Sequence, residues 1–313
     1  MASPIPREPP VTIATLPVSV DMALLQYTAD LDVTVAIIGA GELGGAIAHA
    51  VATRDRVGRV LIVDAAAKVA AGKALDIQQS GPIAGFHTTL EGTDDMSRVT
   101  GCRVCVIADR AGQSPSEWQG EDGLAMLTRL SPYLGDTPIV FAGAAQANLI
   151  SMAAREARIP RGRLIGSSPE ALVSAIAAIV AMEARCSADE VSLTVLGTPP
   201  AGLVVLWSEA SIGGYTLDRV LSQVQLTRLA ARTARLWPPG AYTLGAAAAR
   251  IVEAILESSR RSFSVLTLLN GEFGVRSRVG ALPALLASPG IVHTRTPALT
   301  TRERVLLESA LGA

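Results

Sequence analysis

The chain has 313 residues, of which 49% are hydrophobic and 18% charged, and its formal net charge is −1. This composition excludes a disordered chain, and the balanced charge excludes a basic surface that would attract nucleic acid or an anionic membrane. Apolar runs are shorter than the ~20 residues of a membrane span, no signal-peptide pattern opens the chain, and the three cysteines are too few for a disulfide framework. We expect a cytoplasmic protein of about two domains.

Residues 1–31 differ from the rest because five prolines exclude a continuous helix there. We expect this segment to form an N-terminal arm. Two alternatives are open for this arm: it is poorly ordered, or it reaches across a neighbouring subunit.

From Val33 the sequence alternates between short apolar runs, typical of strands buried on both faces, and helical segments. The predicted strands cover 33–39, 59–64, 103–108, 137–141 and 163–166, and the predicted helices cover 41–53, 65–79, 122–133 and 148–158. This succession predicts an α/β fold with a doubly wound parallel sheet over 32–166.

After about Gly166 the pattern becomes mixed α+β, which predicts a second domain over 167–313. The predicted helices cover 170–185, 216–237, 245–258 and 301–311. The predicted strands cover 190–196 and 203–207, with a hairpin of 264–269 and 276–280 around Asn270-Gly271.

A glycine-rich motif, G-x-G-x-x-G, follows the first predicted strand and opens a helix, which is the context of a dinucleotide-binding loop. Its first glycine makes the tight turn, its second lets the backbone approach a pyrophosphate, and its third lets the helix pack on the strand. Asp64, 25 residues past Gly39, ends the next strand and is placed to bind the ribose hydroxyls, which favours NAD over NADP. Glu42 adds a negative charge beside the expected pyrophosphate. The predicted cofactor-binding residues are Gly39, Gly41, Glu42, Leu43, Gly44 and Asp64.

From about Val33 to Leu311 the chain resembles the lactate/malate dehydrogenase family. The resemblance rests on the loop at 39–44 and on matching stretches at 72–77, 159–167, 250–255 and 269–274. It implies a Rossmann domain, a mixed α+β C-terminal domain of the lactate/malate dehydrogenase type, and hydride transfer between NAD and a 2-hydroxy acid. It also implies a homodimer or homotetramer, for which the helices at 65–79 and 216–237 are candidate interfaces.

The family's catalytic positions carry other residues in this chain. Pro199 stands where the resemblance places the proton-transferring histidine, and Leu172–Ala175 stands where an aspartate and a carboxylate-binding arginine are expected. The loop 112–119 lacks the family's two arginines, and Gly143–Ala145 replaces the turn under the nicotinamide.

The chain has three histidines, and none is expected to replace the missing one. His49 falls on the helix after the glycine loop, His87 precedes a strand, and His293 falls in a C-terminal strand. The thiols Cys102 and Cys105 form a C-x-x-C on a predicted strand, where residues three apart point to opposite faces, so no metal site is expected.

Two hypotheses about function follow, and whether the chain is an enzyme stays open between them. In the first, it is a non-catalytic family member, a pseudoenzyme that binds a small molecule or a protein and could still bind NAD(H). In the second, it is an NAD-dependent oxidoreductase with a changed substrate and a rebuilt active site, for which Arg110, Glu170 and Tyr242 are the catalytic candidates and Trp118 and Thr198 could line the cleft. A conventional 2-hydroxy acid dehydrogenase is disfavoured because no histidine lies between His87 and His293.

Overall fold

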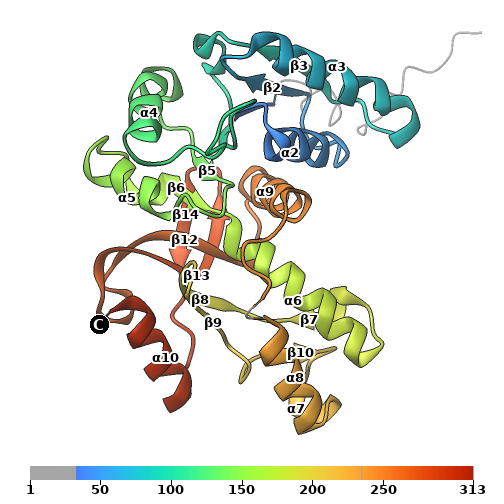
Figure 1. The fold of residues 1–313 in the computed structure, drawn as a ribbon, viewed down its shortest axis with the longest axis vertical. Coiled ribbons are helices and arrows are strands. Elements are labelled where there is room, and N and C mark those ends of the chain that lie inside the picture. Colours follow the sequence, from blue (N-terminus) through green and yellow to red (C-terminus); the bar gives the residue numbers. More distant parts are fainter. Residues whose placement is uncertain (1–32, 234, 313) are drawn as a thin grey trace, which may run out of the picture.

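A computed structural model describes residues 33–233 and 235–312 (Figure 1). The predicted N-terminal arm lies outside the described residues. Within them, no helix is long and apolar enough to cross a membrane.

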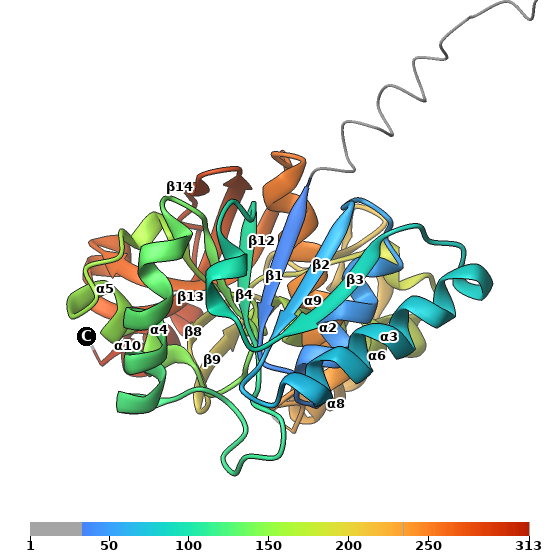
Figure 2. The same cartoon turned by 90° about the horizontal axis from the view of Figure 1, so that it is seen from above.

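The first half of the described chain forms the predicted parallel sheet, in the order β3-β2-β1-β4-β5-β6. Its strands are β1 (Thr34–Ile38), β2 (Arg59–Val63), β3 (Thr89–Thr93), β4 (Val104–Ile107), β5 (Ile139–Phe141) and β6 (Leu164–Gly166). Apart from β3 and the first residues of β1 and β2, Thr34 and Arg59, they are apolar, because both faces of the sheet are covered. The covering helices of this half are α2 (Glu42–Ala52), α3 (Ala67–Ala84), α4 (Gly120–Leu134) and α5 (Ala147–Arg155). Figure 2 shows α2 and α3 on one face and α4 and α5 on the other.

The same sheet continues into the second half, because β6 pairs with β12 antiparallel through Gly166 and Leu266. The added strands are β12 (Ser262–Asn270), β13 (Arg276–Ala287), β8 (Val195–Thr198), β9 (Gly202–Val205) and β14 (Gly290–Thr294), which complete an eleven-stranded sheet. A small second sheet contains β7 (Val191–Ser192), β10 (Ser211–Ile212) and β11 (Tyr215–Thr216). The helices are α6 (Ser168–Ala184), α7 (Leu217–Val220), α8 (Gln223–Thr233), α9 (Ala241–Leu256) and α10 (Thr301–Leu311). The predicted α/β class is confirmed, and the domain boundary at 166 stays a prediction.

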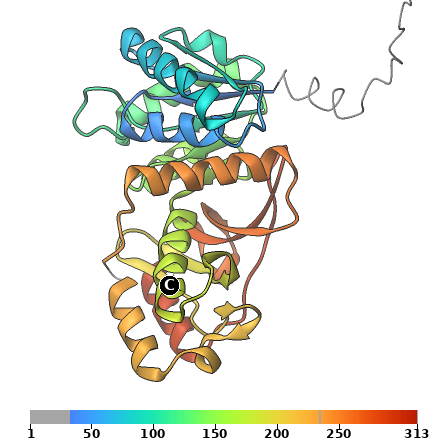
Figure 3. The ribbon, with the colours of Figure 1, turned by 90° about the vertical axis from the view of Figure 1, so that its right-hand side faces the viewer.

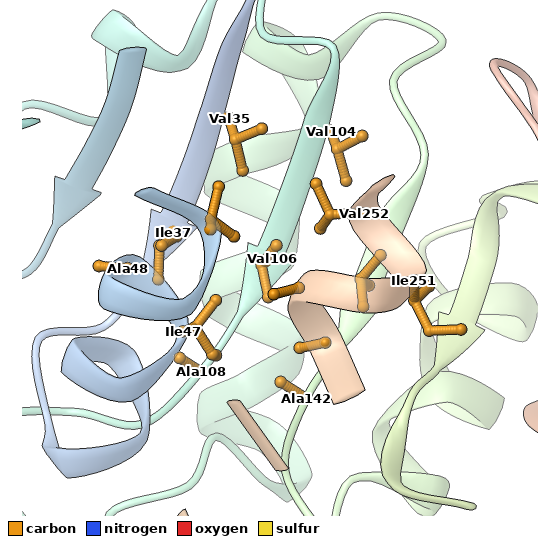
Figure 4. Close-up of a cluster of buried hydrophobic side chains, with 14 of the residues drawn as sticks. Val35, Ile37, Ile47, Ala48, Val104, Val106, Ala108, Ala142, Ile251 and Val252 are labelled. Carbon is orange, nitrogen blue, oxygen red and sulfur yellow. The ribbon is translucent and has the colours of Figure 1, made fainter. Parts of the chain in front are cut away.

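Helix α9 joins the two halves, because it belongs to the second half in sequence but packs on the first (Figure 3). Its Gly245 lies so close to α2 that a Cβ there would come within 2.9 Å of the Ala46 carbonyl carbon. Ile251 and Val252 of α9 are fully buried in the same core as Val35 and Val106 (Figure 4). Burial of each such side chain contributes roughly 1.5–3 kcal/mol, so this packing stabilises the contact between the two halves.

Four predicted details are corrected by the structure. The predicted strand 190–196 is divided into β7 and β8. The predicted helix 216–237 breaks between α7 and α8, because Leu221 is extended and the Ser222 hydroxyl accepts a hydrogen bond from the Gln225 N–H. The predicted helix 65–79 continues to Ala84. Cys102 precedes β4 instead of lying on it, and its thiol packs in the same core as that of Cys105.

Candidate functional site

The candidate site is the region at the carboxyl ends of β1, β2, β4 and β5, where doubly wound sheets bind their ligands, and we refer to this region as the crevice. In Figure 2 β1 runs downward from the upper part of the molecule, so its carboxyl end is the lower one. Three segments of the crevice present backbone N–H groups: the glycine loop 39–44, the segment after β4 and the turn 143–145.

The glycine loop has the backbone geometry that the motif predicts. Gly39 has a φ of 119°, which favours glycine, and its N–H donates to the Val63 carbonyl at 2.7 Å. A Cβ on Gly44 would overlap the Gly39 carbonyl oxygen. The third glycine therefore allows α2 to pack directly against the end of β1, as predicted. Leu43 is buried and Glu42 is exposed in the first turn of α2.

Asp109, two residues past the end of β4, packs against this loop. Its side chain is 6% exposed. Its Oδ1 accepts the Gly44 N–H at 2.8 Å, and its carbonyl accepts the Gly41 N–H at 2.9 Å. A Cβ on Gly41 would overlap the Asp109 carboxylate, which therefore fills the space that this glycine leaves open. Sequence reasoning missed Asp109, and the only available signal was a charged residue immediately after an apolar strand.

Asp64 is buried beside the same loop. Its Oδ2 accepts the N–H groups of Ala40 at 2.8 Å and Ala111 at 3.0 Å, and its Oδ1 accepts that of Ala66 at 2.8 Å. Both carboxylate oxygens are thus bonded to backbone that the sheet holds in place. The predicted contact of Asp64 with a ribose stays a prediction.

A third carboxylate, that of Glu117, closes the turn after β5. Its two oxygens accept the N–H groups of Ala144 at 3.1 Å and Ala145 at 2.9 Å. The remaining N–H of the turn, from Gly143, donates to Oε1 of Gln146 at 2.9 Å. All three donors of the turn are therefore bonded within the chain, and sequence reasoning identified neither Glu117 nor Gln146 as part of the site.

Glu117 reaches the turn because the loop that carries it is folded onto itself. The Arg110 guanidinium lies 4.7 Å above the Trp118 ring and donates to the Pro115 carbonyl at 2.9 Å. The Arg110 N–H donates to the Ser116 carbonyl at 2.7 Å. The structure thus uses Arg110 and Trp118 to close the loop 110–119.

The other two catalytic candidates lie elsewhere. Glu170, in the first turn of α6, is 5% exposed, accepts the Ser264 N–H at 3.2 Å and lies 3.5 Å from the Arg250 guanidinium. Burial raises the pKa of Glu170, and Arg250 opposes that rise. Tyr242, in the first turn of α9, is 82% exposed. The structure therefore does not bring Arg110, Glu170 and Tyr242 together.

The second half contains a cavity of about 1290 Å³ between α6, β9, α8 and α10. Leu172 and Pro200 line it, as do two tryptophans, Trp207 and Trp237. Thr198, a candidate for lining the cleft, instead donates its hydroxyl to the Val279 carbonyl at 3.0 Å. The cavity wall is mixed, because it contains these apolar side chains and also Asp218, Arg302 and Glu303.

The histidines lie where the sequence predicted, away from the β8–β9 turn that carries Pro199. His49 is exposed on α2, His87 precedes β3 and lies 3.0 Å from the Asp55 carboxylate, and His293 is exposed on β14. Among the described residues, no group of three or more His, Cys, Asp and Glu side chains could hold a metal ion.

The chain is similar to malate dehydrogenases over nearly its whole length. It is 26% identical over 296 residues to a malate dehydrogenase of a Roseiflexus species, covering 89% of this chain and 95% of that protein. The malate dehydrogenase of Salinibacter ruber superposes with a TM-score of 0.79 at 25% identity, covering 89% and 94% of the two chains. The lactate dehydrogenase of Cryptosporidium parvum, solved with lactic acid and NAD, shares the fold with a TM-score of 0.80 at 21% identity, covering 90% and 95%. No protein-family model matches the chain. These similarities support the malate/lactate dehydrogenase family and its fold.

Proposed function

From this shared fold, we propose that the chain is a non-catalytic relative of the malate and lactate dehydrogenases that works as a binding or regulatory protein. The observation that carries the proposal is the β8–β9 turn, where Pro199 replaces the expected histidine and none of the chain's three histidines lies nearby. A proline cannot accept or donate the hydroxyl proton, a step that contributes about 10²–10⁴-fold to such reactions.

The replaced groups around this position support the same proposal. The segment Leu172–Ala175 of α6 stands where the resemblance places an aspartate and a carboxylate-binding arginine, and Leu172 lines the cavity. The apolar side chains of this segment offer no bidentate partner for a substrate carboxylate, which an arginine would bind and orient. The arginine that lines the cavity, Arg302, comes from α10 instead. The cavity is large enough for a small-molecule ligand, and its two tryptophans favour a ligand with apolar or aromatic surface.

NAD is the cofactor that the fold implies, but the residues of this crevice do not fit it in its expected place. The N–H groups that a pyrophosphate would use at the start of α2 include that of Gly44, which donates to Asp109. The carboxylate also covers Gly41, where the dinucleotide backbone would approach. Our proposed function therefore contains no hydride-transfer step.

The test is a turnover assay of the full chain with malate, lactate, oxaloacetate and pyruvate, each with NAD(H) and NADP(H). We expect no absorbance change at 340 nm that co-elutes with the protein on size exclusion. Turnover that co-elutes with the chain and falls in Arg110→Gln or Tyr242→Phe would contradict the proposal and support the oxidoreductase hypothesis. Turnover that is identical in all variants and elutes elsewhere identifies a contaminating host dehydrogenase.

A further inference from the structure

We infer that the Asp109 carboxylate is an internal anion that occupies the pyrophosphate position of the glycine loop and excludes NAD(H) from it. The inference rests on the proposed function, because both hold that the family's site is altered in this chain. It adds that Asp109, in the first half of the chain, is the residue that excludes the cofactor.

The first argument concerns hydrogen-bond donors. A helix N-terminus binds a phosphate through N–H groups that have no partner inside the helix. In α2 the Gly44 N–H is bonded to Asp109 Oδ1, and the loop donors that precede the helix are also used: Ala40 by Asp64 and Gly41 by the Asp109 carbonyl. A phosphate that used the Gly44 donor would have to break its hydrogen bond to Asp109, which would leave the buried Asp109 carboxylate without that donor.

The second argument concerns space. In a dinucleotide-binding loop the second glycine is required so that the phosphates can approach its backbone. Here the three atoms nearest to a Cβ built on Gly41 are the carboxyl carbon and the two oxygens of Asp109. The volume over Gly41 is therefore filled by the chain itself.

The third argument concerns charge. Asp64 and Asp109 are both buried against the loop, and Glu42 is exposed at its helix end. Two cations of this region are engaged elsewhere: the Lys73 ammonium lies against Gly45, and Arg110 stacks on Trp118. A pyrophosphate carries two negative charges, so its entry beside these carboxylates is opposed by like-charge repulsion in a poorly solvated crevice.

The inference is tested by titrating the full-length protein with NADH in phosphate-free buffer, followed by nicotinamide fluorescence and by calorimetry. We expect no saturation of the wild-type protein up to millimolar NADH and a gain in affinity of roughly tenfold or more in Asp109→Ala. Asp109→Asn keeps the acceptor for Gly44 and fills the same space, so it should gain less. Asp94→Ala removes an exposed acid just after β3 and should gain nothing. Saturable binding by the wild-type protein, no gain in Asp109→Ala, or an equal gain in Asp94→Ala would overturn the inference.

A second measurement does not depend on NADH. Gly41→Ala should lower the free energy of unfolding in the wild-type background, where its Cβ meets the Asp109 carboxylate, and should be tolerated in the Asp109→Ala background. An equal effect in both backgrounds would show that the carboxylate does not lie over Gly41, and would overturn the inference. Turnover separates the two proposals: NADH binding by the wild-type protein without turnover contradicts only this inference, whereas co-eluting turnover contradicts the proposed function.

Discussion

The crevice of the first half and the cavity of the second half differ in opposite ways from what the shared fold predicts. In the crevice the motif residues are present, but Asp64, Asp109 and Glu117 accept the N–H groups that a ligand would use. In the second half, where we propose that the family's catalytic groups are replaced, a cavity of about 1290 Å³ is present. The sequence motif thus predicts the backbone conformation of a loop, and the cavity shows only that there is volume for a ligand. Neither feature alone establishes the chemistry that the fold implies.

Contacts inside the chain account for each glycine of the loop 39–44. Gly39 adopts a positive φ and contacts the Asp109 backbone, Gly41 contacts the Asp109 carboxylate, and Gly44 contacts the Gly39 carbonyl. Each glycine is therefore required by contacts inside the chain. Internal packing is enough to explain G-x-G-x-x-G at this position.

The largest expected effect on stability comes from a substitution that disrupts the packing of this loop. In Gly44→Ala the new Cβ would overlap the Gly39 carbonyl, and relief requires α2 or the end of β1 to move. We expect a loss of about 3 kcal/mol or more in the free energy of unfolding, measured in urea, at the upper end for overpacked sites.

Gly72→Ala is the matched control, because it lies inside α3 with nothing within 4 Å of a new Cβ. It should leave stability unchanged or raise it by up to about 1 kcal/mol. Equal effects of the two substitutions would show that α2 does not pack directly on β1.

The next largest effect tests whether Glu170 has a structural or a catalytic role. In Glu170→Ala the Ser264 N–H and the Arg250 guanidinium lose their partner inside the protein. We expect a loss of about 2–4 kcal/mol, slightly below the usual cost of breaking a buried ion pair because Arg250 is partly exposed. The measurement is urea unfolding together with the 340 nm assay. Unchanged stability would contradict a structural role for Glu170.

Sequence patterns predicted the parts of the molecule that depend on local order. The continuous apolar runs predicted β1, β2 and β4, because strands buried on both faces need no polar residue. The break between α7 and α8 was missed because Leu221 continues the apolar pattern of a helix while its backbone is extended. Asp109 was missed because its partner, Gly44, is 65 residues away in the sequence. A carboxylate that caps a helix far away in the sequence leaves no local sequence pattern, since the order of the strands in the sheet decides which helix it reaches.

The smallest expected effect concerns the wall of the cavity. Glu303 of α10 borders the cavity and accepts hydrogen bonds from the side chains of Thr300 and Ser208 at 2.7 and 2.8 Å. Burial alone would raise the pKa of Glu303, but these hydrogen bonds and those from the Thr300 and Ser208 N–H groups outweigh it and hold the pKa below its usual value of 4.5. The stability that the carboxylate contributes is therefore present above pH 4.5 and is lost as the pH falls through the lowered pKa.

In Glu303→Gln we accordingly expect a loss of about 1 kcal/mol at pH 7, typical of a lost capping interaction, and a difference from the wild-type protein that shrinks as the pH falls below 4.5. The measurement is urea unfolding at a series of pH values. Glu308→Gln, an exposed position on the same helix, should change stability by less than about 0.5 kcal/mol. A Glu303→Gln difference that grows at low pH would mean that the protonated form is the one that holds α10 against Ser208. The cavity wall would then depend on a neutral hydrogen bond, unlike the crevice, where carboxylates are bonded to backbone N–H groups.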